Sequence, residues 1–151
     1  MRAKPIIRVA RTADAERIGE LDREWTPILG RTARFQMAAS KGRLLVAELD
    51  GDLVGYAAHG RFFGYDFLEL LAVQPAKRRQ GIATALFRAV ESRSRSGKLF
   101  TSTNRSNRPM RRLCERLGFL PSGAVENLDA CDAELFYFKE VEVHSASGAQ
   151  E

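Results

Sequence analysis

The sequence predicts an α/β fold in which strands and helices alternate along a single domain. Three observations predict it. A short apolar run over 67–73 leads through a basic loop into an amphipathic helix that starts near Ile82. Two β-like runs flank Asp50-Gly51, and this dipeptide is a strong hairpin signal. A second amphipathic helix follows Asn107 and stops at Gly118.

The first half of the chain is expected to hold a strand, two helices and an antiparallel hairpin. In order, these are a strand over 6–9, helices over 14–25 and 31–40, and hairpin strands over 44–49 and 53–58. A connection over 60–66 then leads into the strand over 67–73. This strand is almost wholly apolar, so we expect it to be buried on both faces, with Glu69 as its one charge.

The second half is expected to continue with a strand, a helix and a closing pair of strands. The strands are predicted over 99–103, 122–128 and 135–143, and the helix follows Asn107. An acidic connection that includes Asp129, Asp132 and Glu134 joins the last two strands. We therefore predict one domain over 1–143, followed by a small, polar and disordered tail over 144–151.

Composition narrows the class of protein. A chain of 151 residues with 44% hydrophobic residues can bury a core without disulfides or metals. Cys114 and Cys131 show no C-x-x-C spacing, and neither His59 nor His144 joins a ligand cluster, so we expect no metal site. The sequence has no apolar stretch of about 18 residues, the length that a membrane-spanning helix requires. The opening M-R-A-K-P-I-I-R is too short for a secretory signal. The prediction is a cytoplasmic protein that does not enter membranes.

Positive charge is concentrated in the middle of the chain. The formal net charge is +5, yet residues 77–116 hold twelve Lys or Arg against two Glu. Such a segment suits phosphate groups, although solvated helix faces explain many of these arginines. A basic nucleic-acid-binding module is the second interpretation. The aromatic residues are not interleaved with the arginines as a base-stacking platform requires, so we consider nucleic acid unlikely as a partner.

The loop before the predicted helix at Ile82 is suited to hold phosphate. A helix start offers unpaired N–H groups and a partial positive charge, and Gly81 and Ala83 let a ligand approach closely. The spacing R-x-x-G-x-A at Arg78, Gly81 and Ala83 resembles the Q/R-x-x-G-x-G/A signature of the GCN5-related N-acetyltransferase (GNAT) superfamily. In that family the loop binds the pyrophosphate of acetyl-CoA.

A second motif follows about thirty residues later. The run N-R-P-M-R-R-L-C-E-R-L-G-F over 107–119 is similar to the family pattern N-x-x-A-x-x-L-Y-x-x-x-G-F. Asn107 is either a helix N-cap or a contact to the cofactor. Cys114 stands where many relatives have a tyrosine that protonates the departing thiolate, so it is either a proton donor or core packing.

The resemblance implies a three-layer GNAT-like fold over about 6–143. This is a mixed, mostly antiparallel twisted sheet of about seven strands flanked by about four helices, in which the fourth and fifth strands splay apart. Acetyl-CoA, the expected acyl donor, would lie in that gap and needs no metal. Its implied contacts are Leu71 and Val73 on the strand, then Arg78, Arg79, Gln80, Gly81, Ile82, Ala83 and Thr84 in the loop and helix start, and Asn107. Dimers are common among such proteins, so a homodimer stays open.

The expected chemistry is direct N-acetyl transfer within a ternary complex. An alkyl ammonium must lose a proton before it attacks the thioester, and Glu69 is the best candidate base. Its alternatives are an ion pair with an arginine or a side chain that points to solvent. A backbone N–H near Leu71 or Val73 would hold the oxyanion. Cys114 or water would protonate the thiolate.

The acceptor is not identified by the sequence. It is a small-molecule amine or a protein amino group. Several aromatic residues either line an acceptor pocket or pack in the core, and three acidic residues either favour a cationic amine or form a solvated loop. The aromatic residues are Trp25, Phe35, Phe62, Phe63 and Tyr65. The acidic residues are Glu126, Asp129 and Asp132. A third interpretation keeps the fold without turnover, as a regulatory domain that binds acyl-CoA.

Overall fold

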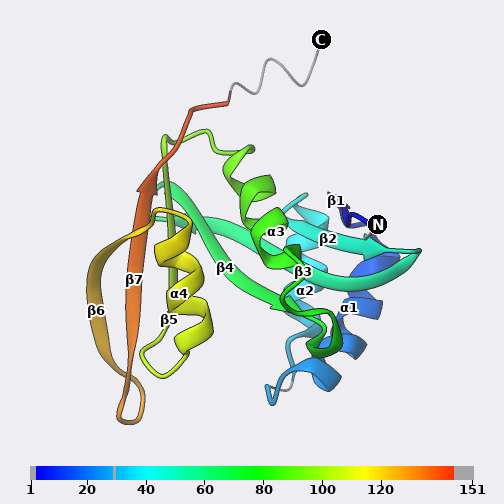
Figure 1. Cartoon of the computed structure of the whole chain (residues 1–151), viewed down its shortest axis with the longest axis horizontal. Helices are drawn as coiled ribbons and strands as arrows, with labels where there is room; N and C mark the ends of the chain where they lie inside the picture. The colour runs from blue at the N-terminus through cyan, green and yellow to red at the C-terminus, as the bar shows by residue number, and fades with distance from the viewer. Residues whose placement is uncertain (1–2, 29, 145–151) are drawn as a thin grey trace. The chain divides into compact units, whose positions relative to one another are not determined.

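The described strands form one sheet of seven, in the order β1-β2-β3-β4-β5-β7-β6 (Figure 1). A computed structural model describes residues 3–28 and 30–144. The chain divides into two compact units. The first holds the residues up to Gly60 together with Glu69–Val90, and the second holds Arg61–Leu68 together with the residues from Glu91 onward. Strands β3 and β4 run through both units.

The elements follow the order that the sequence predicts. The first seven are β1 (Ile6–Val9), α1 (Thr12–Trp25), α2 (Thr32–Ser40), β2 (Leu44–Leu49), β3 (Asp52–Phe62), β4 (Tyr65–Val73) and a 3₁₀ turn (Pro75–Lys77). The others are α3 (Ile82–Glu91), β5 (Lys98–Asn104), α4 (Arg108–Arg116), β6 (Leu120–Asp129) and β7 (Asp132–Glu140). The mixed α/β class and the mostly antiparallel sheet are therefore confirmed.

The predicted hairpin lies in the first unit. Strand β2 pairs antiparallel with both β1 and β3. Asp50 and Gly51 join β2 to β3 with φ values of 53° and 87°, the positive values that a two-residue type I′ turn requires. The D-G signal therefore predicted both the turn and the pairing correctly.

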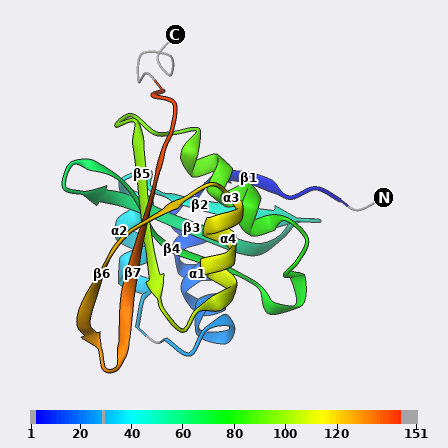
Figure 2. The ribbon, with the colours of Figure 1, turned by 60° about the vertical axis from the view of Figure 1, so that its left-hand side comes forward.

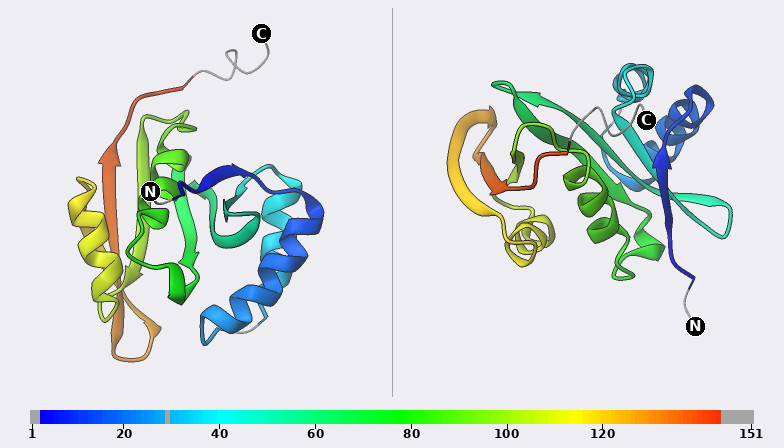
Figure 3. Two further views of the ribbon diagram at one scale, coloured as in Figure 1. Left: turned by 45° about the vertical axis from the view of Figure 1, so that its right-hand side comes forward. Right: turned by 90° about the horizontal axis from the view of Figure 1, so that it is seen from above.

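Helices cover both faces of the sheet in the first unit. Figure 3 shows α1 and α2 on one face of this part of the sheet and α3 on the other. One core joins Ile18 of α1, Phe35 of α2 and Tyr56 of β3, and all three are fully buried. On the α3 side, a Cβ at Gly55 would lie 3.3 Å from side-chain atoms of Ile82 and Leu86. The absence of a side chain at Gly55 thus lets α3 pack closely on β3.

A buried polar network holds α2 in place. Arg31, the residue before α2, donates from Nε and Nη2 to the two carboxylate oxygens of Asp22 at 3.0 and 2.9 Å. Tyr56 Oη donates to Asp22 Oδ1 at 2.7 Å, and burial together with this bond raises the pKa of the phenol. The network ties the start of α2 to α1 and β3.

A second ion cluster fixes the start of α1. Arg8 on β1 donates to both oxygens of Asp14 and also contacts the Glu48 carboxylate. The Arg8 guanidinium holds the pKa of the Asp14 carboxyl down at about 2, below its ordinary 3.8. Since Asp14 also accepts from the Arg11 backbone N–H at 2.8 Å, it caps the first turn of α1.

In the second unit, β4 begins parallel to β5, and β7 lies between β5 and β6. The β4 to β5 register runs from Asp66 opposite Leu99 to Leu68 opposite Thr101, while β7 is antiparallel to both of its neighbours. Helix α4 runs alongside β5 and β7 (Figure 2). Leu99, Thr101 and Thr103 are buried at alternating positions of β5, as expected for a strand with one covered face.

Aromatic side chains gather on the other face of the second unit. Phe62 lies with its ring centroid 5.3 to 5.4 Å from those of Phe67, Phe100 and Phe136. Phe138 and Tyr65 extend this cluster through Phe100. Their rings occupy the alternate positions to the buried residues of β5 and β7, so they form the face of these strands opposite the buried one.

The structure corrects four predicted details. The connection expected over 60–66 is only Phe63-Gly64, because β3 and β4 extend into it and both residues have positive φ. The acidic connection is also wrong: Asp129 ends β6, Asp132 and Glu134 lie in β7, and Ala130-Cys131 alone joins the strands. The last strand ends at Glu140 rather than 143. Strand β4 is not buried on both faces, since several of its residues, Glu69 among them, are exposed or half-buried.

The predicted tail lies mostly outside the described residues. Of residues 144–151, only His144 is described, and its backbone N–H donates to the Ser94 carbonyl at 2.6 Å. No described helix is long and apolar enough to cross a membrane. The described residues also hold no group of three or more His, Cys, Asp or Glu that could bind a metal ion.

Candidate active site

The loop that joins β4 to α3 lies at the surface of the first unit. It opens with the 3₁₀ turn over Pro75–Lys77 and is tied to β3 by the Gln74 N–H, which donates to the Val54 carbonyl at 2.8 Å. Arg79 and Gly81 have φ values of 65° and 80°. Two residues in the left-handed region turn the chain sharply into the start of α3.

The start of α3 is open and carries no negative side chain. Gly81 accepts from the Ala85 N–H at 3.0 Å, so the helical bonding begins at that carbonyl. No acidic residue lies in the first turn of α3, and residues 78–81 are all exposed. A Cβ at Gly81 would meet nothing within 4 Å. The unpaired N–H groups and the positive end of the helix are therefore accessible to an anion.

The predicted contacts on strand and loop differ in burial. Val73 is 7% exposed and Ile82 2% exposed, so their side chains pack in the core and only their backbone is suited to a ligand. Leu71, Ala83 and Thr84 are half-buried. The Arg78 side chain turns back toward the strand, where its Nε lies 3.4 Å from the Val73 carbonyl oxygen.

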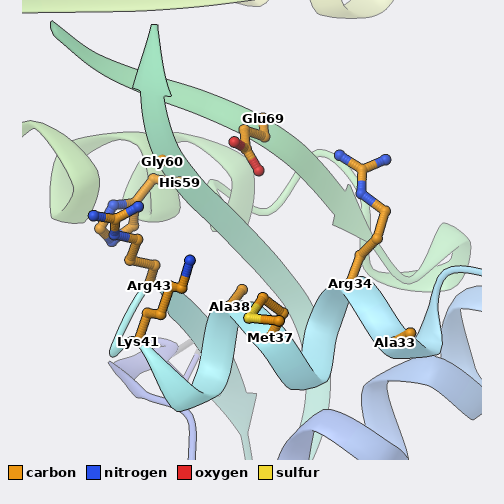
Figure 4. Close-up of a pocket in the computed structure, with 9 residues that line it drawn as sticks. All are labelled: Ala33, Arg34, Met37, Ala38, Lys41, Arg43, His59, Gly60 and Glu69. Atoms are coloured by element: carbon orange, nitrogen blue, oxygen red, sulfur yellow. The ribbon is translucent and has the colours of Figure 1, made fainter. Parts of the chain in front are cut away.

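Glu69 lies on β4 and lines a pocket of about 320 Å³ in the first unit. The other lining residues come from α2, from the segment between α2 and β2, and from β3: Ala33, Arg34, Met37, Ala38, Lys41, Arg43, His59 and Gly60. Figure 4 shows the Glu69 carboxylate directed into this pocket, with Arg34 on one side and Lys41 and Arg43 on the other. The volume falls at the lower end of the range for small-molecule sites.

Gly60 makes room for the Glu69 carboxylate. A Cβ built at Gly60 would overlap Glu69 Oε2 and would lie 3.0 Å from Cδ. Among the described residues, the Glu69 side chain forms no ion pair and no hydrogen bond. Of the two alternatives to a catalytic role, the structure thus favours the exposed side chain over the ion pair with an arginine.

Asn107 and Cys114 belong to the second unit. Asn107 is the N-cap of α4, and its Oδ1 accepts from the Met110 N–H at 3.3 Å. Cys114 is fully buried on the core side of α4, where burial, assisted by the charge of Glu115, raises the pKa of its thiol to about 12. Capping by Asn107 is confirmed, and burial favours the packing alternative for Cys114. Their contacts to cofactor and thiolate stay predictions.

The residues weighed for an acceptor pocket have other positions. Trp25 and Phe35 are core residues of the first unit, so they pack rather than line a pocket. Phe62, Phe63 and Tyr65 belong to the aromatic face of the second unit. Glu126 is exposed on β6. Asp129 accepts from Asn104 Nδ2 at 2.9 Å and Asp132 from Ser106 Oγ at 2.6 Å, so these carboxylates bind the chain at the end of β5 and just after it.

The sequence did not identify the basic side of the pocket. Arg34, Lys41 and Arg43 lie far from Glu69 along the chain, and the neighbouring positions of β2, β3 and β4 in the sheet, together with the packing of α2, bring them to one place. A local signal existed in Lys41 and Arg43, which flank Gly42 within the break between α2 and β2. That signal carries no information about which strand faces it.

The start of α3 has no carboxylate and follows a basic loop that contains Gly81. Together with this sheet order, it defines the class of acyl-CoA-dependent acyltransferases that the motifs imply. A family model described as "Acetyltransferase (GNAT) family" matches residues 8–119. The chain belongs to the GNAT acetyltransferase family, which makes it an acetyltransferase domain with acetyl-CoA as its acyl donor.

Solved structures agree with this membership. An acetyltransferase of the GNAT family from Bacillus cereus ATCC 10987 is 31% identical with a TM-score of 0.86, over 92% of this chain and 99% of that chain. The yncA protein of Salmonella typhimurium, solved with its cofactor acetyl-CoA, is 21% identical with a TM-score of 0.72, over 94% and 96%. The ribosomal-protein-S18-alanine N-acetyltransferase from Escherichia coli is 18% identical with a TM-score of 0.78, over 95% and 97%. The comparison with curated proteins finds no match.

Proposed function

We propose that this enzyme transfers the acetyl group of acetyl-CoA directly to an amine acceptor bound at the same time. The observation that carries the proposal is the open helix start at Gly81, which has no acidic neighbour in its first turn. A diphosphate placed there gains hydrogen bonds from the backbone and a favourable field from the helix. The space beside Gly81 is open, since a Cβ built there would meet nothing within 4 Å.

The donor is held mainly by the backbone. We assign the diphosphate to the N–H groups of residues 80–84, with the exposed Arg79 and the guanidinium of Arg78 as side-chain partners. The pantetheine arm is assigned to the backbone of Leu71 and Val73 on β4. Asn107 is proposed to contact the cofactor through its side-chain amide nitrogen, because its side-chain oxygen caps α4.

Glu69 acts on the acceptor. An alkyl ammonium transfers one proton to the Glu69 carboxylate, directly or through a water, and becomes a nucleophile. The amine nitrogen then attacks the thioester carbonyl, a C–N bond forms, and the C–S bond breaks. A backbone N–H at Leu71 or Val73 stabilises the oxyanion, an interaction worth about 3 kcal/mol of barrier in comparable sites.

The proton balance closes without a further reagent. The amine loses its second proton as the tetrahedral intermediate collapses, and the leaving thiolate takes up one proton. The net products are an N-acetyl amide, free CoA and one proton released to solvent. Burial raises the pKa of the Cys114 thiol to about 12, which makes this thiol a weak acid toward the leaving thiolate, so we assign the thiolate's proton to solvent. Cys114 as donor remains the alternative that substitution can test.

Calorimetry and a thiol-release assay together test the proposal. Acetyl-CoA is expected to bind the purified protein, and free CoA is expected to appear when amines are added. Binding without release for any amine would instead support the regulatory acyl-CoA-binding domain. Failure to bind acetyl-CoA, combined with salt-dependent binding of duplex or single-stranded nucleic acid, would support the basic nucleic-acid module.

Three broader predictions accompany this function. We propose that residues 1–143 act as a single catalytic domain. The cytoplasmic location rests on the low cysteine content, with Cys114 and Cys131 both free in the described chain. Assembly as a homodimer is proposed only because dimers are common in the family.

A further inference from the structure

The pocket around Glu69 is positively charged. Three of its lining side chains, Arg34, Lys41 and Arg43, are cations, and Glu69 is its one carboxylate. With His59 neutral, the lining carries a net charge of about +2 from these groups. Binding of a protonated amine needs the carboxylate and gains nothing from the cations, which repel an ammonium group. The cations therefore point to a second feature of the acceptor.

These charges are not used within the protein. Several other arginines of the first unit are paired: Arg8 with Asp14 and Glu48, Arg17 with Glu20, and Arg31 with Asp22. Across residues 3–28 and 30–144, by contrast, no ion pair or side-chain hydrogen bond involves Arg34, Lys41 or Arg43. Glu69, in the same pocket, pairs with none of them. The pocket thus presents one anionic and several cationic groups that a ligand can reach separately.

The arrangement in space matches a ligand with two opposite charges. In Figure 4 the Glu69 carboxylate lies between Arg34 on one side and Lys41 with Arg43 on the other. Met37, Ala33 and Ala38 supply the apolar part of the wall from α2. The buried contact of Arg31 with Asp22 and Tyr56 anchors the start of α2, so this wall is held in place against the strands.

We propose that the acceptor is a small amine that also carries a carboxylate or a phosphate group. Its amine lies at Glu69, and its anion binds Lys41 and Arg43. This inference rests on the proposed acetyl transfer, since it names the substrate class of the same site. It differs from the expectation that acidic residues on β6 and β7 favour a purely cationic amine, because Asp129 and Asp132 bind the chain instead.

Matched pairs of amines test the inference by binding. β-Alanine is compared with β-alaninamide, and O-phosphoethanolamine with ethanolamine, by calorimetric titration into the protein saturated with CoA. The member that carries a carboxylate or phosphate is called the anionic member, and its partner without that group the neutral member, although both carry an ammonium group near neutral pH. At least one anionic member is expected to bind about tenfold more tightly than its neutral partner, since a charge-assisted hydrogen bond is worth about that factor. Equal affinity in both pairs, or a preference for the neutral members, would overturn the inference.

Substitution identifies the cations responsible. Arg43→Gln and Lys41→Gln are expected to remove most of the preference for the anionic member without weakening the binding of the neutral member, whose ammonium group these cations repel. The different basicity of the two amines cancels when the ratio between members in a variant is divided by the same ratio in the wild-type protein. Arg23→Gln is the matched control, since Arg23 is exposed on α1 and does not line the pocket. A preference that survives in both pocket variants would assign the anion to another site and refute the proposal.

The same titrations separate the two levels of the argument. If acetyl-CoA binds and acetylates neutral amines better than anionic ones, the proposed function stands and this inference fails. If acetyl-CoA does not bind, both fail together. Thermal unfolding of each variant, measured in parallel, shows whether the fold is retained. If a pocket variant loses the preference and also unfolds several degrees below the Arg23→Gln control, Arg43→Lys, which keeps the charge, is expected to restore the preference.

Discussion

Replacing Gly81 by glutamate is expected to abolish acetyl-CoA binding with little loss of fold. At φ 80° a residue with a Cβ sits in the left-handed region, which destabilises the folded state by about 1–2 kcal/mol. The space around that Cβ is open, so no clash adds to this figure. For an assumed separation of about 5 Å between the new carboxylate and a bound diphosphate, and an effective dielectric of about 20, the repulsion is about 3 kcal/mol for each phosphate charge, or about a hundredfold in Kd.

The turn between β2 and β3 provides a matched control. Gly51 has a φ of 87°, and a Cβ there also meets nothing within 4 Å. Gly51→Glu therefore introduces the same charge and a similar backbone strain away from the α3 start. Titration calorimetry with acetyl-CoA and urea unfolding are measured on both variants. Wild-type affinity in Gly81→Glu, or an equal loss in Gly51→Glu, would refute the assignment of the diphosphate to this helix start.

Four other substitutions test the remaining roles. Glu69→Gln is expected to lower kcat about a hundredfold while the Kd for acetyl-CoA stays within about twofold; an unchanged kcat between about pH 6 and 9 would remove Glu69 from the mechanism. Cys114→Ala should lower the free energy of unfolding by about 1–2 kcal/mol, because it leaves a small buried cavity, with kcat unchanged; a large loss of kcat at retained stability would identify the thiol as proton donor. The carboxyl of Asp14 has a lowered pKa in the folded state, so it stabilises the fold by about 2 kcal/mol above about pH 4, and this stabilisation disappears as the pH falls through about 2. In urea unfolding, Asp14→Asn should therefore be less stable than wild type at pH 7 and equal to it near pH 2. Asp22→Asn leaves Arg31 with a weaker buried partner and is expected to lower the free energy of unfolding by about 3 kcal/mol, and a loss below about 1 kcal/mol would contradict the network.

Local patterns predicted most elements because their causes are local. The D-G pair sets the hairpin turn, Asn107 caps α4, and the positive φ of Gly81 marks the entry to α3. Each of these depends on backbone conformations of a few consecutive residues. The prediction was wrong at the facing ends of β3 and β4. A connection was expected over 60–66, yet β3 and β4 extend into this range and leave only a two-residue turn.

The acidic run near the end of the chain shows the same limit. Asp129 and Asp132 looked like a solvated loop because strands rarely favour acidic residues. In the fold Asp129 accepts a hydrogen bond from Asn104, the last residue of β5, and Asp132 accepts one from Ser106, two residues further on. Partners 25 to 26 residues away decide the conformation, and no local pattern reports them.

The donor side of the site was readable from the chain by itself. A helix start, its glycine and its basic loop are consecutive residues, so the order of residues 78–84 is enough to specify the backbone groups that an anion needs. The acceptor side was decided by tertiary structure. The pairing of β2, β3 and β4 and the anchoring of α2 through Arg31 bring Lys41 and Arg43 to Glu69. Such a pocket depends on distances between elements, which are set by packing of the whole core rather than by the spacing of neighbouring residues.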